Sequence, residues 1–148
     1  MEENLTQNAS ELKLNNYALG FLKETAKWVN FLAIMGFIGI GLIVIIAIFA
    51  GAIFSALPDS NPYAEISGGI ITVIYLLIAV LYFFPVLYMY RFADKMKTAL
   101  RRNDEDALTD AFMHLKSHYK FIGILTIVML AFYALGFILT LIGGLAVM

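Results

Sequence analysis

The 148-residue sequence predicts an all-α membrane protein with three transmembrane helices. Three segments contain no charged residue, and each exceeds the roughly 20 apolar residues that a helix needs to cross the hydrocarbon core of a bilayer. All ten Lys and Arg residues lie outside those segments, within residues 1–27 and 91–120. The composition agrees with this class of protein, because 61% of the residues are hydrophobic and 14% are charged.

The first expected element is an amphipathic helix over residues 10–27, with Ser10 as its N-cap. Its apolar face is expected to consist of four residues at helical spacing: Leu14, Tyr17, Phe21 and Trp28. Lysines accompany this face, so the helix either lies in the cytoplasmic interface of the membrane or packs on the cytoplasmic hairpin described below.

The remaining elements complete a single membrane domain over residues 1–148. They are span one (28–54), an outer loop (55–65), span two (66–90), a cytoplasmic helical hairpin (91–120) and span three (121–148). The spans have no polar stripe along one face, which excludes the buried helices of a soluble domain.

The positions of the cations predict the orientation of the spans. The outer loop and the C-terminal end contain no Lys or Arg, whereas the N-terminal segment and residues 91–120 hold all ten. Short segments rich in Lys and Arg stay in the cytoplasm. We therefore expect a cytoplasmic N-terminus, a cytoplasmic 91–120 segment and a C-terminus outside.

The 91–120 segment has the pattern of two helices joined by a tight turn. Phe92, Met96 and Leu100 recur every four residues and extend span two into the cytoplasm as an amphipathic helix. Asn103 and Asp104 interrupt it, and either can cap the next helix. The apolar face of that next helix is expected to consist of Leu108, Phe112, Leu115 and Tyr119.

Small residues recur about every four positions in all three spans. They are Gly36, Gly39, Gly41, Ala47 and Gly51 in the first, Gly68 and Thr72 in the second, and Gly136, Thr140 and Gly144 in the third. Such faces allow two helix backbones to approach closely, either within one chain or between subunits. Pro85, near the cytoplasmic end of span two, is expected to kink its helix.

The sequence contains few candidate catalytic, cofactor-binding or metal-ligating residues. The chain has no cysteine, which excludes disulfides and thiolate sites, and the spans contain no ionisable Asp, Glu, Lys, Arg or His of the kind that coupled transport uses. Asp110, His114 and His118 share a helix face at a spacing that a zinc or nickel site could use, but no fourth ligand is evident. We therefore assign no catalytic, cofactor-binding or metal site and do not expect an enzyme.

Several runs of residues resemble a family of small uncharacterised bacterial membrane proteins, known as a domain of unknown function. These runs are LGFLKETAKWVNFLAIMGFIGIG, FPVLYMYRFADKMKTAL, NDEDAL and LKSHYKFIGI. The resemblance covers about residues 14–135 and is most specific from Pro85 to Lys120. It implies a location in the bacterial inner membrane and carries no assigned activity.

Two functions remain open at the level of the sequence. In the first, the protein is a scaffold or accessory subunit that docks a partner protein through its hairpin, whose apolar stripe needs a cover. In the second, it is a homo-oligomeric pore or lipid-perturbing assembly that uses the small-residue faces. The expected partners are the lipid bilayer, including anionic lipids, and a protein partner or further copies of the chain. A nucleic-acid partner is not expected.

Overall fold

The computed structural model describes residues 15–57 and 68–146 of the chain and is all-helical over them. Its helices are α2 (Asn16–Ser55), α3 (Gly68–Arg102) and α4 (Glu105–Ala146). Each of these three is long and apolar enough to cross a membrane, so the prediction of an all-α chain with three such helices is confirmed.

Helix α2 begins later than expected and includes the first span without a break. Asn15 is its N-cap, because the side-chain Oδ1 accepts a hydrogen bond of 2.8 Å from the backbone N–H of Ala18. From Asn16 the helix continues for 40 residues, so residues 16–27 and span one form one rod rather than two elements. The expected N-cap Ser10 and the residue Leu14 lie outside the described residues.

The ends of the other spans are described only in part. Residues 58–65 of the expected outer loop, the first two residues of span two and the last two of span three lie outside the described residues. Helix α3 continues through Pro85, which is buried, and ends at Arg102. Helix α4 begins three residues later and is 42 residues long.

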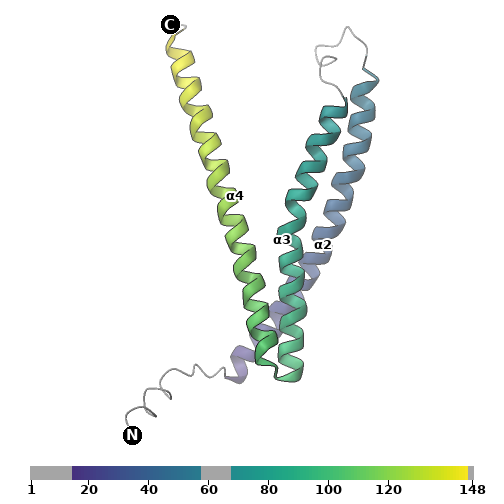
Figure 1. The fold of residues 1–148 in the computed structure, drawn as a ribbon, viewed down its shortest axis with the longest axis vertical. Coiled ribbons are helices and arrows are strands. Elements are labelled where there is room, and N and C mark those ends of the chain that lie inside the picture. Colours follow the sequence, from purple (N-terminus) through teal and green to yellow (C-terminus); the bar gives the residue numbers. More distant parts are fainter. Residues whose placement is uncertain (1–14, 58–67, 147–148) are drawn as a thin grey trace.

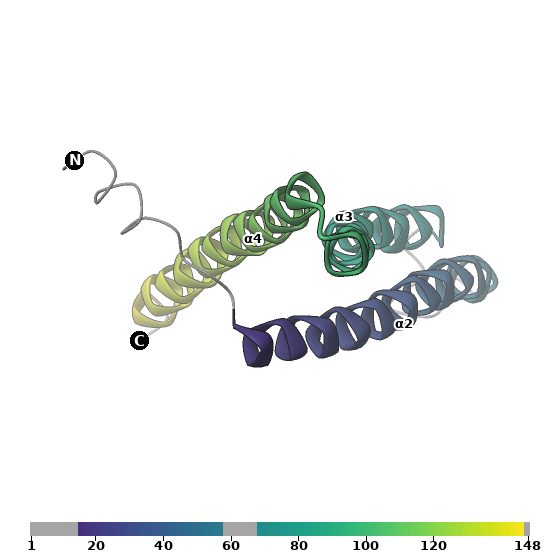
Figure 2. The ribbon, with the colours of Figure 1, turned by 90° about the horizontal axis from the view of Figure 1, so that it is seen from below.

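The three helices form a V (Figure 1). Helices α2 and α3 lie side by side and make one arm, and α4 makes the other. Helix α3 is the central element, because it packs against both neighbours (Figure 2). The arms meet where the charged residues of α3 and α4 lie, and they diverge toward the C-terminus of α4.

Small residues bring α2 and α3 close together, as one of the two interpretations of their spacing predicted. A Cβ atom added at Gly36 would lie 2.8 Å from a methyl group of Val86, and one added at Gly51 would overlap the hydroxyl of Thr72. The Thr72 hydroxyl donates a hydrogen bond to the carbonyl oxygen of Ala47, at 3.2 Å. This arm is therefore held by close backbone approach.

Other members of the small-residue pattern have no such role in the described part of the chain. A Cβ atom added at Gly39, Gly41 or Gly136 would meet no atom within 4 Å. In α4 every residue from Thr126 to Ile142 is exposed, and Gly144 belongs to the following residues, whose burial the structure does not describe. The diverging half of α4 is thus uncovered on all sides.

Candidate functional site

The charged end of the molecule is where all three helices contribute to one apolar core. Its buried residues are Ala26 of α2, Phe92 and Met96 of α3, and Ala111 of α4. Partly buried residues surround them: Leu22, Val29, Leu100, Leu108 and Leu115. Residues 16–27 pack on this core through Leu22 and Ala26, which agrees with one of the two placements expected for them.

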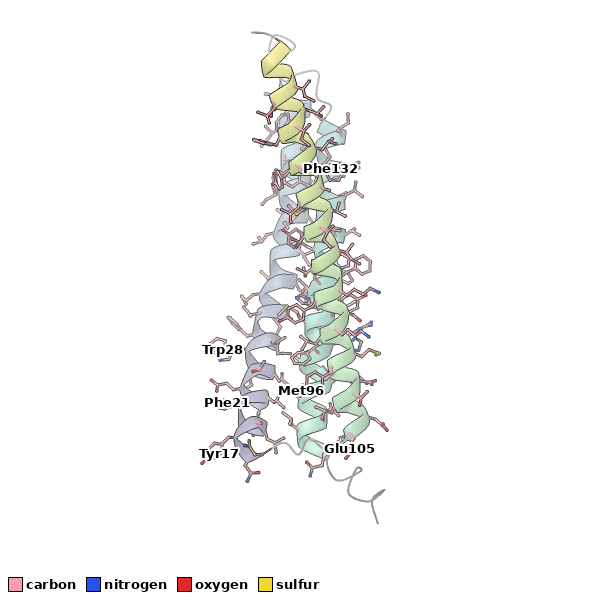
Figure 3. All side chains as sticks on the ribbon, turned by 90° about the vertical axis from the view of Figure 1, so that its left-hand side faces the viewer. Tyr17, Phe21, Trp28, Met96, Glu105 and Phe132 are labelled. Carbon is pink, nitrogen blue, oxygen red and sulfur yellow. The ribbon has the colours of Figure 1, made fainter. Side chains whose placement is uncertain are left out.

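The face that α2 uses for this packing is not the predicted one. Tyr17, Phe21 and Trp28 are 80%, 68% and 61% exposed, and they point away from Met96 on the outer side of α2 (Figure 3). The packed face consists of Leu22, Ala26 and Val29. A helix approaches its neighbour most closely through small residues such as Ala26, so the aromatic face is left exposed, as the alternative placement in the membrane interface also requires.

The predicted apolar face of the first turns of α4 is also packed only in part. Of the four residues expected on its apolar face, Leu108 and Leu115 pack on the core, but Phe112 and Tyr119 are exposed. The buried positions beside the two leucines belong to alanine, since Ala107, before Leu108, and Ala111, between Leu108 and Leu115, are almost completely buried. On α3 the expected face of Phe92, Met96 and Leu100 does line the core.

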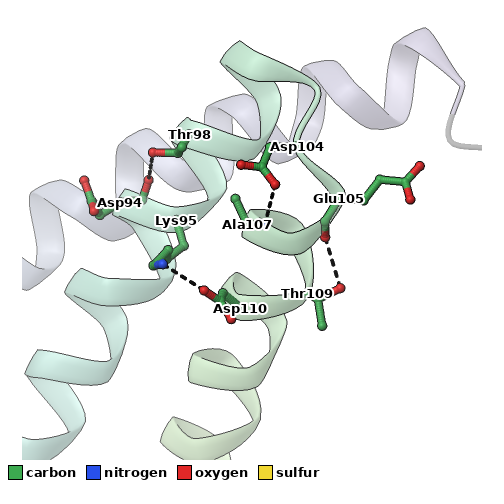
Figure 4. Close-up of polar contacts among 8 residues, drawn as sticks. All are labelled: Asp94, Lys95, Thr98, Asp104, Glu105, Ala107, Thr109 and Asp110. Atoms are coloured by element: carbon green, nitrogen blue, oxygen red, sulfur yellow. Dashed lines mark hydrogen bonds and ion pairs between the residues drawn. The ribbon is translucent and has the colours of Figure 1, made fainter.

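A turn of two residues connects α3 to α4. Asn103 adopts a φ of 50°, the left-handed conformation that often terminates a helix and that asparagine tolerates better than most residues. Asp104 is the N-cap of α4, because its Oδ1 accepts a hydrogen bond of 2.9 Å from the N–H of Ala107 (Figure 4). Glu105 and Asp106 follow in the first turn, where the helix dipole favours acidic side chains.

A salt bridge joins α3 and α4 about two helical turns away from this connection. The Nζ of Lys95 lies 2.8 Å from the Oδ2 of Asp110 (Figure 4). Because the hydrogen bond and the opposite charge stabilise both ionised forms, the pKa of Asp110 is lowered and that of Lys95 is raised. Both side chains are partly exposed, so the pair contributes more to the register of the two helices than to stability.

The two histidines of α4 have different surroundings. Partial burial, with a further contribution from the charge of Arg91, lowers the pKa of His114 below its ordinary value of 6.5. His118 lies 3.0 Å, through its Nδ1, from the backbone carbonyl oxygen of Pro85. A carbonyl oxygen only accepts, so Nδ1 carries the proton and donates this bond from α4 to α3.

These contacts determine where the three residues of the candidate zinc or nickel site, Asp110, His114 and His118, are directed. Asp110 is directed to Lys95, and His118 to Pro85. Within residues 15–57 and 68–146, no three or more Asp, Glu or His side chains are arranged to hold a metal ion. Two of the three candidates therefore link α4 to α3 instead of converging on one point.

A cavity of about 370 Å³ opens between the start of α2 and the α3–α4 turn. Leu19, Leu100 and Leu108 provide its apolar wall. Lys23, Asp104 and Glu105 provide charge at its edge. Gly20 also lines it, and a Cβ atom added there would meet nothing within 4 Å. We refer to this feature as the tip cavity.

Sequence reasoning did not identify the tip cavity. A signal for it was present, since Leu19, Leu22, Ala26 and Val29 recur at helical spacing and define a second apolar face of α2 beside the aromatic one. The packing of that face on α3 leaves Leu19 and Gly20 next to the turn, one helical turn before the core begins.

Comparison with known protein families gives one finding. A family model described as "Family of unknown function (DUF5362)" matches residues 63–141. No curated protein and no solved structure matches the chain.

Proposed function

The chain belongs to the DUF5362 family, whose function is unknown, and from this premise we propose that it is a non-enzymatic scaffold or accessory subunit that docks a protein partner at the tip cavity. The distribution of cations supports a location in the inner membrane of a bacterium, with the N-terminus and residues 91–120 in the cytoplasm and the C-terminus outside. The partner is then a cytoplasmic protein or the cytoplasmic part of another membrane protein.

The tip cavity is the observation that carries this proposal. Protein interfaces obtain most of their affinity where a large side chain fills a desolvated pocket on the other surface. The tip cavity has an apolar wall from all three helices, and its Lys23, Asp104 and Glu105 offer charged partners at the edge. Two carboxylates at or near the cavity have structural contacts, since Asp110 pairs with Lys95 and Asp104 caps α4, which supports docking rather than catalysis.

The substitution Gly20→Leu tests the proposal by filling the tip cavity. There is open space around Gly20, so the new side chain enters the cavity without displacing atoms of the fold, and Leu has a higher helix propensity than Gly. A photo-reactive amino acid at Leu19, on the cavity wall, is expected to cross-link to one protein partner in native membranes. Gly20→Leu in the same chain is expected to reduce that adduct by about tenfold or more.

The matched control is Gly39→Leu, which adds the same side chain at another open glycine of α2, within the charge-free segment. It is expected to leave the adduct within about twofold of the parent level. Docking at the tip cavity is contradicted if Gly20→Leu and Gly39→Leu reduce the adduct equally. It is also contradicted if the probe at Leu19 reacts with lipid alone.

A homo-oligomeric assembly is the second candidate, and the uncovered half of α4 favours it. Every described residue from Thr126 to Ile142 is exposed, which leaves this segment open to further copies of the chain. A water-filled pore has less support, because the hydroxyls of Thr126 and Thr140 donate to carbonyl oxygens of their own helix, at 2.9 and 2.8 Å. Mass measurement of single particles in native lipid tests the assembly, and a population of monomers alone contradicts it.

A further inference from the structure

A second cavity, of about 340 Å³, lies between α2 and α3 and is lined mainly by cations. Lys23 and Lys27 come from α2, and Lys97 and Arg101 come from α3. Ala26 and Leu100 complete the lining, and no carboxylate belongs to it. We call this feature the basic cleft.

The packing of α2 on α3 explains why these four charges converge. Ala26 of α2 is fully buried against α3, and Leu100 of α3 packs on the same core. Lys27 follows Ala26 and Arg101 follows Leu100, and these cations lie along one side of the contact between the two helices. Lys23 and Lys27 are one turn apart on α2, as are Lys97 and Arg101 on α3, which places each pair on one helix face.

Nothing in the described part of the chain neutralises these charges by a salt bridge. The one salt bridge within residues 15–57 and 68–146 joins Lys95 to Asp110. Asp94, one turn before Lys97, is not part of the lining. Like charges one turn apart repel each other, so a bound anion relieves a repulsion that the fold itself creates.

The position and lining of the basic cleft indicate the kind of anion. Lys27 directly precedes Trp28, the first residue of the charge-free segment of α2. Arg binds phosphate through two parallel hydrogen bonds, and Lys binds it as a point charge. The partly exposed Leu100 offers apolar surface beside these cations, which suits an amphiphile better than a free ion.

We propose that the basic cleft binds the phosphate headgroup of an anionic lipid, whose acyl chains continue along the apolar segments of α2 and α3. A free phosphate-bearing solute shares the headgroup chemistry but lacks the chains. The basic cleft shares Lys23 and Leu100 with the tip cavity, but Gly20 does not line the cleft, and Lys27 and Arg101 do not line the tip cavity. Substitutions at Gly20 and at Lys27 with Arg101 therefore test the two sites separately.

The test uses the full chain in neutral detergent and native mass spectrometry. Separate titrations with phosphatidylglycerol, phosphatidylcholine and inorganic phosphate are compared. One phosphatidylglycerol is expected to bind at least about tenfold more tightly than phosphatidylcholine, and inorganic phosphate at millimolar concentration is expected not to displace it. The double substitution Lys27→Gln with Arg101→Gln is expected to abolish that preference.

The matched control is Arg102→Gln with Lys116→Gln, which removes two cations that do not line the basic cleft. It is expected to keep the preference within about twofold. All four cleft cations are exposed, so neither double substitution disturbs the core, and Lys27→Arg with Arg101→Lys is expected to restore binding. The proposal is overturned if the control loses the preference for phosphatidylglycerol equally, because such a loss indicates diffuse attraction. It is also overturned if inorganic phosphate displaces the lipid.

Discussion

At the scale of single residues, the surroundings of His114 at the charged end lower its pKa from the ordinary value of 6.5. Its partial burial and the charges of Arg91 and Lys95 lower its pKa, and the carboxylate of Asp110 opposes them. The unfolded chain therefore binds more protons than the folded one between the lowered pKa and 6.5. The contribution of His114 to stability is fully present above pH 6.5 and is lost as the pH falls through the lowered pKa.

Asp110→Asn is expected to lower the pKa of His114 further, because it removes the one carboxylate that raises it. Arg91→Gln is expected to raise the pKa, because it removes a like charge. The measurement is an NMR titration of the imidazole resonances in detergent micelles, with His114→Gln used for assignment. A rise of the His114 pKa in Asp110→Asn contradicts this account of its surroundings.

At the scale of the helices, the contact of α2 with α3 depends on glycines that face one another. A Cβ atom added at Gly68 would overlap the carbonyl oxygen of Gly51 and the hydroxyl of Ser55. Backbone atoms cannot rotate out of the way as the end of a flexible side chain can. The two helices must therefore separate there when Gly68 is replaced.

Gly68→Ala is expected to destabilise the α2–α3 arm by about 1 to 3 kcal/mol, the usual cost of overpacking. The measurement is the free energy of unfolding in mixed micelles. Gly39→Ala adds the same methyl group at a position with open space and is expected to be neutral or slightly stabilising. An equal effect of the two substitutions contradicts a role for close approach at Gly68.

The helices also show which parts of the structure could be predicted from the sequence. Charge-free length predicted three membrane-compatible helices, and Asn103 and Asp104 predicted the break between α3 and α4, because both signals are local. The packed faces of α2 and α4 were predicted only in part. Side-chain size, which put Phe21 and Phe112 on the predicted apolar faces, does not determine which face meets a neighbour when alanines allow a closer contact.

The tip cavity and the basic cleft could not be predicted from the sequence, for a related reason. Leu19 and Leu108 are far apart in the chain, as are Lys27 and Lys97, and the packing of α2 on α3 and of α3 on α4 brings each pair to one cavity. The periodicity within one helix fixes which residues share a face. It contains no information on how two helices are rotated about their axes when they meet.

At the scale of the whole molecule, the apolar core at the charged end is the one place in the described chain where all three helices join. Met96 lies at its centre and is 0% exposed. Met96→Ala is expected to lower the free energy of unfolding by about 2 to 5 kcal/mol, because it leaves a cavity in that core. The measurement is chemical unfolding in mixed micelles.

Phe132→Ala serves as the comparison, since Phe132 is an exposed residue on the diverging half of α4 (Figure 3). It is expected to change the free energy of unfolding by less than about 0.5 kcal/mol. A larger loss in Phe132→Ala than in Met96→Ala contradicts the view that the charged end holds the three helices together.

Because α4 packs on α3 over one half only, a small rotation of the packed half produces a larger displacement at the other end of the helix. The helix is 42 residues long, about 63 Å, and its first half packs on α3 as far as Phe121, whose ring meets that of Phe84. A rotation of about 5° about that contact moves the far end by about 3 Å. Changes in bilayer thickness alter the tilt of a spanning helix. In a bilayer of changing thickness, we therefore expect the uncovered half of α4 to act first on the contact of Phe121 with Phe84.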